Sequence, residues 1–135
     1  TRAPGAYLLD PEPCVTRAGL VRQLAARTGG RQLDPQVAYL AADEPVDDPL
    51  AATFRVREVL PFSVPNLRRY LRANGLAADE IRRRAFPVEP DELRRLLGKL
   101  EGERVALICT TIGRKRMVFV GERWRKGETA QGCRQ

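Results

Sequence analysis

Three segments of residues 53–120 decide the fold of this chain: TFRVREVLPFSVPNLRRYLR (53–72), EIRRRAFPVEPDELRRLLGKL (80–100) and VALICTTIGRKRMVFV (105–120). In the first segment, Phe54 and Val56 alternate with arginines, which predicts a strand with one face partly exposed. Ser63 is placed to cap a following helix, with Pro65 in its first turn. The buried side of that helix consists of aliphatic residues at helical spacing, namely Val64, Leu67 and Leu71. Asn74-Gly75 predicts its end.

The segment EIRRRAFP (80–87) predicts a second strand, and it carries three consecutive arginines, Arg82, Arg83 and Arg84. Neighbouring side chains of a strand point to opposite faces of the sheet. Three adjacent arginines therefore cannot all point away from a covered face. We expect this strand either at the edge of the sheet or in a sheet with one open face, and both arrangements suit binding better than burial.

A second helix and a hairpin are predicted next. Glu89-Pro90-Asp91-Glu92 places acids and a proline in a first helical turn, where the helix dipole favours them. The expected buried side of this helix consists of four leucines: Leu93, Leu96, Leu97 and Leu100. Residues 105–112 are apolar on both faces, as in a central strand. Gly113-Arg114 predicts the turn into an alternating partner strand over 117–120.

The first fifty residues predict a smaller unit of the same class. AYLLD (6–10) is typical of a strand, and CVTRAGLVRQLAARTGG (14–30) predicts one helix that Gly29-Gly30 ends. LDPQVAYLA (33–41) predicts a proline turn and a brief strand. The acidic loop DEPVDDP (43–49) is the best candidate boundary. The whole chain is therefore expected to be α/β (α+β), as one domain or as two small packed units.

The net charge of +7 is unevenly distributed. Residues 1–50 carry five basic and seven acidic side chains, whereas residues 51–135 carry nineteen and ten. Such asymmetry favours a polyanionic partner. An alternative remains, because 21 of the 24 basic residues are arginine. A GC-rich genome raises arginine content without any selection for nucleic acid.

Catalysis has little support in the sequence. The chain has no histidine, which removes the commonest general base and every Ser-His-Asp arrangement. The acids Asp43/Glu44 and Asp47/Asp48 lie in a proline-rich loop and are more typical of a solvated linker. No glycine-rich phosphate-binding loop is present. We therefore predict no catalytic residue.

The three cysteines Cys14, Cys109 and Cys133 lie far apart, with no CxxC pair, so we predict no metal site. Cys109 is expected to be a small buried residue, in a reducing, cytoplasmic setting. The sequence shows no membrane-spanning stretch and no signal peptide. Because it begins at Thr1, we expect a fragment of a longer protein.

Three basic clusters are the candidate nucleic-acid contacts, because the planar guanidinium can bind phosphate through two hydrogen bonds. The first lies on the predicted helix (Arg68, Arg69, Arg72), the second on the arginine strand (Arg82, Arg83, Arg84), and the third at the hairpin tip (Arg114, Lys115, Arg116). The alternative is a solvated surface, which we favour for the helix set alone. Phe86 and Trp124 could stack on bases, or they could equally pack in the core.

The segment IRRRAFPVEPDELRRLL (81–97) resembles the THUMP-like C-terminal domain of a bacterial class I S-adenosylmethionine-dependent methyltransferase family. The positions that fit the family's pattern are Ile81, Arg84, Ala85, Val88, Pro90, Leu93, Arg94 and Leu97. Ala85 stands where glycine is frequent. FRVREVLPFSVPNLRRYLR (54–72) and VALICTTIGRKRMVFV (105–120) are similar to the family's neighbouring blocks.

Upstream, YLLDPEPCVTRAGL (7–20) is similar to the family's Tyr-x-x-Glu-Pro…Ile-Arg-Ala-Gly-Leu segment, with Asp10 in place of Glu and Thr16 in place of Ile. That segment belongs to a ferredoxin-like domain. The resemblance thus implies a ferredoxin-like linker domain at 1–50 and a THUMP-like domain at 51–122. The polar sequence at the end of the chain predicts a flexible tail at 123–135.

The resemblance further implies an accessory, RNA-binding part of a methyltransferase whose catalytic domain is absent from this chain. The expected partners are RNA (tRNA or rRNA) and the protein's own upstream methyltransferase domain, with no membrane. No cofactor is expected in this chain, and S-adenosylmethionine is expected for the parent enzyme. The rival hypothesis is a structural or protein-interaction module that braces the catalytic domain or a dimer, with its arginines merely solvated.

Overall fold

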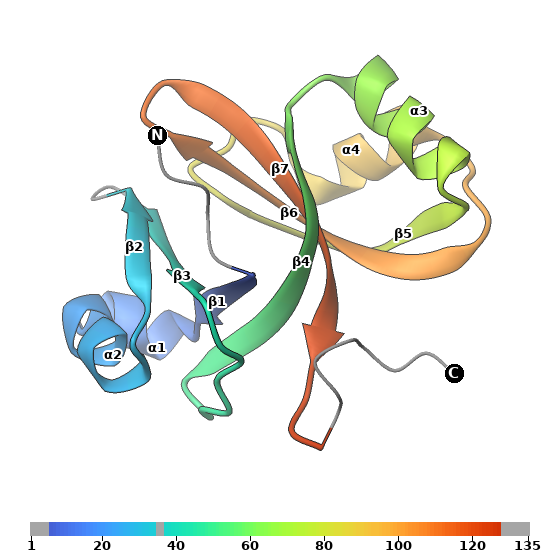
Figure 1. Ribbon diagram of the computed structural model, residues 1–135. Coiled ribbons are helices and arrows are strands. Elements are labelled where there is room, and N and C mark those ends of the chain that lie inside the picture. The colour runs from blue at the N-terminus through green and yellow to red at the C-terminus, as the bar shows by residue number, and fades with distance from the viewer. Residues whose placement is uncertain (1–5, 35–36, 128–135) are drawn as a thin grey trace. The chain divides into compact units, whose positions relative to one another are not determined.

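The computed structural model describes residues 6–34 and 37–127, which form two compact units (Figure 1). The first unit contains the described residues up to Val56 and those from Arg123 onward, and the second is Arg57–Glu122. Strands β4 (Ala51–Pro61) and β7 (Lys115–Trp124) each contribute residues to both units. The chain thus has a mixed α/β architecture, as predicted.

The second unit contains α3 (Val64–Ala73), β5 (Leu76–Arg84), α4 (Pro90–Leu97) and β6 (Glu103–Ile112), besides its parts of β4 and β7. Its strand order is β4-β7-β6-β5. Strands β5 and β6 run parallel and are joined through α4, whereas β6 and β7 form an antiparallel hairpin. The predicted succession of strand, helix, strand, helix and hairpin is confirmed.

One apolar core holds the second unit together. It combines the inner sides of α3 and α4 with one face of β6 and β7, and α3 and α4 contact each other beside β5 (Figure 1). The buried residues of this core are Leu67, Leu71, Leu76, Phe86, Leu93, Leu97, Val105, Leu107, Cys109, Val118 and Val120. In β6, the intervening residues Ala106 and Ile108 are also buried, which confirms that this strand is buried on both faces.

The ends of α3 follow the local signals in the sequence. The Ser63 hydroxyl accepts a hydrogen bond from the Asn66 backbone N–H at 3.4 Å, and Pro65 lies in the first turn. The helix ends before Asn74, whose side-chain amide donates to the Tyr70 carbonyl at 2.8 Å. Gly75 then adopts φ +63°, which glycine tolerates because it lacks a Cβ. The predicted cap and stop are both confirmed.

The first unit contains β1 (Tyr7–Pro11), α1 (Pro13–Arg17), α2 (Val21–Thr28), β2 (Arg31–Asp34) and β3 (Val37–Ala42), besides its parts of β4 and β7. Its strands are ordered β2-β3-β1-β4 with antiparallel pairing throughout. The core is built from buried apolar side chains of β1, β3 and the two helices: Tyr7, Leu9, Val15, Leu24, Leu40 and Ala42.

The single helix predicted for 14–30 is wrong, because the structure has two helices, α1 and α2. Gly19 adopts φ +71° between them, a left-handed conformation that a continuing helix excludes. The prediction failed because Val15, Leu20 and Leu24 have helical spacing. Leu20 is in fact 45% exposed and lies outside the core.

Other predicted elements have different limits in the structure. β5 begins at Leu76 rather than at residue 80, and the segment before β3 is a strand, β2, rather than only a turn. Leu96, predicted to be buried on α4, is 36% exposed. β7 extends to Trp124, two residues into the predicted tail. The remainder of that prediction, from residue 128, lies outside the described residues, as does Cys133.

Candidate nucleic-acid interface

β5 is the last strand in the sheet order, so the predicted edge position of the arginine strand is confirmed. Its arginines nevertheless do not form one cluster. Arg83 is in register with Cys109, whose side chain lies in the helix-covered core, so Arg83 points to the helix side. Arg82 and Arg84 point to the opposite face.

Intramolecular contacts hold these arginines. Arg83 donates to the Phe86 carbonyl at 2.7 Å and pairs with the Glu89 carboxylate at 2.8 Å. Arg82 pairs with Glu80 at 2.6 Å, and Arg84 also has an interaction within the chain. Two of the three guanidinium groups are therefore neutralised by neighbouring acids, which lowers their attraction for an external anion.

The three α3 arginines have different environments. Arg68 donates from Nε to the Leu97 carbonyl at 3.2 Å and from Nη2 to the Leu96 carbonyl at 2.7 Å. These are the last carbonyls of α4, which lack partners inside their own helix. Arg69 donates to the Asn66 side-chain oxygen at 2.8 Å and is exposed. Arg72 is exposed, and no side-chain partner for it is found in residues 6–34 and 37–127.

The hairpin tip is the most accessible basic cluster. Arg114, Lys115 and Arg116 are all exposed, and in the described part of the chain their side chains have no hydrogen-bond or ion-pair partner. The tip is also well anchored. Ile112 pairs with Lys115 across the turn, and the Phe62 backbone N–H donates to the Arg116 carbonyl at 2.8 Å.

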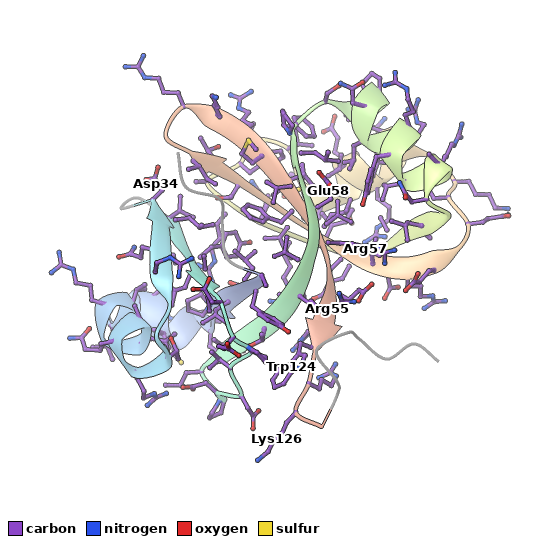
Figure 2. The ribbon with its side chains drawn as sticks, viewed as in Figure 1. Asp34, Arg55, Arg57, Glu58, Trp124 and Lys126 are labelled. Atoms are coloured by element: carbon purple, nitrogen blue, oxygen red, sulfur yellow. The ribbon has the colours of Figure 1, made fainter. Side chains whose placement is uncertain are left out.

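Many of the other cations of the second unit form ion pairs with acidic side chains. Arg57 lies on β4 (Figure 2) and pairs with Glu122 at 2.6 Å and with Glu103 at 3.6 Å. Three more cations have acidic partners, Arg95 with Glu92, Lys99 with Glu101, and Arg104 with Asp79. In the described part of this unit, the exposed cations with no hydrogen bond or ion pair are therefore those of the hairpin tip and Arg72, and Arg69 bonds only to a neutral amide oxygen.

Of the two candidate stacking residues, Phe86 is buried and Trp124 is half-buried. Phe86 is 4% exposed and meets the Phe62 ring edge-on, with ring centroids 4.9 Å apart. Trp124, at the end of β7, packs against the core of the first unit (Figure 2). Both rings therefore contribute to folding, through apolar burial.

The thiol of Cys109 is buried in the core of the second unit. Burial raises the pKa of the Cys109 thiol from 9.0 to about 12, so this thiol stays protonated at neutral pH. No group of three or more potential metal ligands occurs in the described ranges. None of the described helices is long and apolar enough to cross a membrane. What the geometry does provide is exposed positive charge at the tip of a hairpin whose strands pair up to the turn.

Sequence reasoning missed the structural roles of two arginines. Arg68 closes the end of α4, and Arg94 donates to the Ala78 carbonyl at 3.0 Å and the Asp79 carbonyl at 3.4 Å. The carbonyl acceptors are 15 to 29 residues away in sequence. No local pattern could have identified them.

The chain is similar to proteins described as methyltransferases. It is 44% identical over 113 residues to an uncharacterized S-adenosylmethionine-dependent methyltransferase of Mycobacterium tuberculosis, in strains CDC 1551 / Oshkosh and ATCC 25618 / H37Rv. The match covers 83% of this chain and 31% of each relative, so the chain spans about a third of their length.

A solved crystal structure shares the fold. It is that of a proposed methyltransferase from Porphyromonas gingivalis W83, with a TM-score of 0.76 and 25% sequence identity. The similarity covers 91% of this chain and 30% of that one. Residues 51–123 match the family model described as THUMP domain-like, and the chain belongs to this family.

Proposed function

We infer that this chain is an accessory, RNA-binding region of an S-adenosylmethionine-dependent methyltransferase, and that the catalytic portion lies outside it. The family match and the names of the M. tuberculosis relatives support this proposal. The relatives are about three times as long as the matched region, which leaves room for a catalytic portion. S-adenosylmethionine would supply the methyl group there, and no residue of this chain is assigned to hold it.

The observation that carries the proposal is the cluster Arg114, Lys115 and Arg116 at the hairpin tip, which is exposed and unpaired within the described residues. Guanidinium groups bind phosphate oxygens through paired hydrogen bonds, and a lysine ammonium adds a point charge. The β6–β7 pairing fixes the backbone of the tip. The tip would thus hold an RNA backbone in one position relative to the catalytic portion, without reading base sequence.

The basic clusters on β5 and α3 are less suited to a primary RNA contact, because several of their arginines already have partners within the chain. Arg82 and Arg83 are neutralised by Glu80 and Glu89, and Arg68 is engaged with the end of α4. Binding RNA through them would first require breaking these contacts. We therefore propose the hairpin tip as the primary contact.

Fluorescence anisotropy with a short RNA hairpin, titrated at several salt concentrations, tests the proposal. Removing a cation that binds one phosphate should reduce the slope of log K against log salt by about 0.7 to 0.9. Neutralising the tip with Arg114→Gln, Lys115→Gln and Arg116→Gln should therefore lower the slope by roughly 2 to 3 and weaken binding at least tenfold.

The matched control removes the same charge elsewhere, through Arg95→Gln, Lys99→Gln and Arg104→Gln, three cations that already have acidic partners. This control should retain most of the wild-type affinity. Absence of salt-sensitive RNA binding by the wild-type chain would refute the proposal. Equal affinity for a DNA duplex of matched length would refute its RNA component.

The rival function, a module that braces the catalytic portion, is favoured by the internal use of Arg68, Arg82 and Arg83. The same tip variant separates the two hypotheses. Unchanged RNA affinity, combined with weaker binding to the catalytic portion of a longer parent protein, would support the bracing role instead.

A further inference from the structure

The outer face of α3 has a basic hollow whose charge is not balanced by the helix itself. An open hollow of about 510 Å³ is lined by Pro65, Arg68, Arg69, Arg72 and Ala73. The helix sequence, VPNLRRYLRA, contains no acidic residue. Arg68 and Arg72 are four positions apart, and Arg69 and Arg72 are three apart, so their side chains are neighbours on the helix surface. Like charges at these spacings disfavour the helix rather than stabilise it.

On the neighbouring helix α4, by comparison, both arginines have partners within the chain. Arg95 pairs with Glu92 one turn earlier, and Arg94 donates to two backbone carbonyls of β5. On α3, by contrast, Arg72 is exposed and has no side-chain partner in the described residues, and Arg69 bonds only to a neutral amide oxygen. Arg68 therefore has a role in the folded structure, because it bonds to the end of α4. In the part of the chain that the structure describes, Arg69 and Arg72 have no acidic partner that would explain their charge.

Arg68 contributes a fixed wall to this hollow. Its Nε and Nη2 atoms donate to the carbonyls of Leu97 and Leu96, and these two hydrogen bonds hold the guanidinium beside the end of α4. Arg69 uses only Nη1 in its bond to Asn66, which leaves most of its donors available. The hollow therefore combines one immobilised guanidinium with two available ones, an arrangement suited to phosphate oxygens.

The hollow and the hairpin tip belong to the same unit, and one backbone hydrogen bond links the segment before α3 to the tip. The Phe62 backbone N–H bonds to the Arg116 carbonyl, and α3 begins two residues after Phe62. The helix then runs for 10 residues, or about 15 Å. A nucleic-acid strand that contacts the tip can therefore continue along α3, where successive phosphates would meet Arg69 and Arg72.

We propose that the α3 hollow is a second phosphate-binding subsite, so that the partner is a nucleic acid long enough to span both the hairpin tip and α3. This proposal rests on the RNA-binding function proposed above. It makes Arg69 and Arg72 the contacts and Arg68 a positioning residue. A partner that reaches only the tip would bind more weakly, because fewer counterions are released.

The test compares Arg69→Gln/Arg72→Gln with a charge-matched control, Arg95→Gln/Lys99→Gln, by fluorescence anisotropy on RNA hairpins of increasing stem length. All four side chains are exposed, and the folding of each variant is checked by circular dichroism. We expect the α3 variant to lower the salt slope by about 1.4 to 1.8 on the longer hairpins. On the shortest hairpins it should bind like the wild type, and the control should retain the wild-type slope throughout.

Two results distinguish the possible failures. If the α3 variant keeps the wild-type affinity and slope at every length, while the tip variant no longer binds, the second subsite is refuted and the proposed function stands. If the wild-type chain shows no salt-sensitive RNA binding at any length, both the subsite and the proposed function are refuted.

Discussion

At Gly102 the fold depends on the absence of a side chain. It lies between α4 and β6 and adopts φ +133°, a conformation that residues with a Cβ rarely occupy. A Cβ at this position would overlap the Gly75 carbonyl oxygen and lie 2.5 Å from the carbonyl carbon and 3.1 Å from the Leu76 nitrogen. These are backbone atoms, so they cannot rotate away as a side chain would.

Gly102→Ala should therefore be strongly destabilising. The backbone strain costs roughly 1 to 3 kcal/mol. The same carbonyl accepts a hydrogen bond from the Glu103 N–H at 2.8 Å, and breaking that bond costs about 1 kcal/mol more. We expect a total loss of about 3 kcal/mol, which corresponds to a fall in Tm of roughly 10 °C for a chain of this size.

Gly75→Ala is the matched control. Gly75 also has a positive φ, of +63°, but its Cβ would meet no atom within 4 Å. The left-handed conformation costs an alanine roughly 1 to 2 kcal/mol, partly offset by the lower entropy of the unfolded chain. Urea denaturation followed by far-UV circular dichroism measures both variants. If Gly75→Ala and Gly102→Ala lose the same stability, the steric argument is wrong.

Three further predictions concern single residues. Ala85 has φ +52°, so Ala85→Gly should relieve left-handed strain and raise stability by about 0.5 to 1 kcal/mol in urea denaturation, whereas a loss would contradict the strain argument. Arg68→Gln should lower the free energy of unfolding by about 1 to 2 kcal/mol, because it leaves the last carbonyls of α4 unpaired. Its control, Arg69→Gln, should change stability by less than about 0.5 kcal/mol. Equal effects of the two substitutions would count against the capping role of Arg68. Burial raises the pKa of Cys109 from 9.0 to about 12, so between these pH values the folded chain keeps a proton that the unfolded chain releases, and stability should fall as pH rises. The urea midpoint of the wild type should accordingly fall more steeply between pH 9 and pH 12 than that of Cys109→Val, and parallel curves would refute this.

Most elements of the second unit were predictable because their signals are local. Ser63, Pro65 and Gly75 mark the ends of α3, and the leucine spacing identifies its buried side. The same approach failed at Gly19, where a helical spacing of apolar residues hides a break between α1 and α2. Apolar periodicity reports which residues could share a helix face, but it does not report a single residue with left-handed backbone geometry.

The departure of Ala85 from the family's frequent glycine has a physical explanation in the structure. Its φ of +52° is the conformation that glycine adopts without strain. The Ala85 carbonyl accepts a hydrogen bond from the Thr111 hydroxyl at 2.6 Å, which ties this turn to β6. The sequence indicated an unusual residue at this position, and the backbone geometry supplied the reason.

The fold class, the order of elements in the second unit and the excess of arginine after residue 50 could all be read from the amino-acid sequence. Which arginines retain an available charge depends instead on how distant elements pack together. Arg83 and Glu89 meet because the chain turns after β5, and Arg57 and Glu122 meet although 65 residues separate them. The difference lies in the sequence separation over which each kind of interaction acts. Periodicity and capping depend on neighbours along the chain, whereas the partner of a long, flexible cation depends on which distant elements pack beside it.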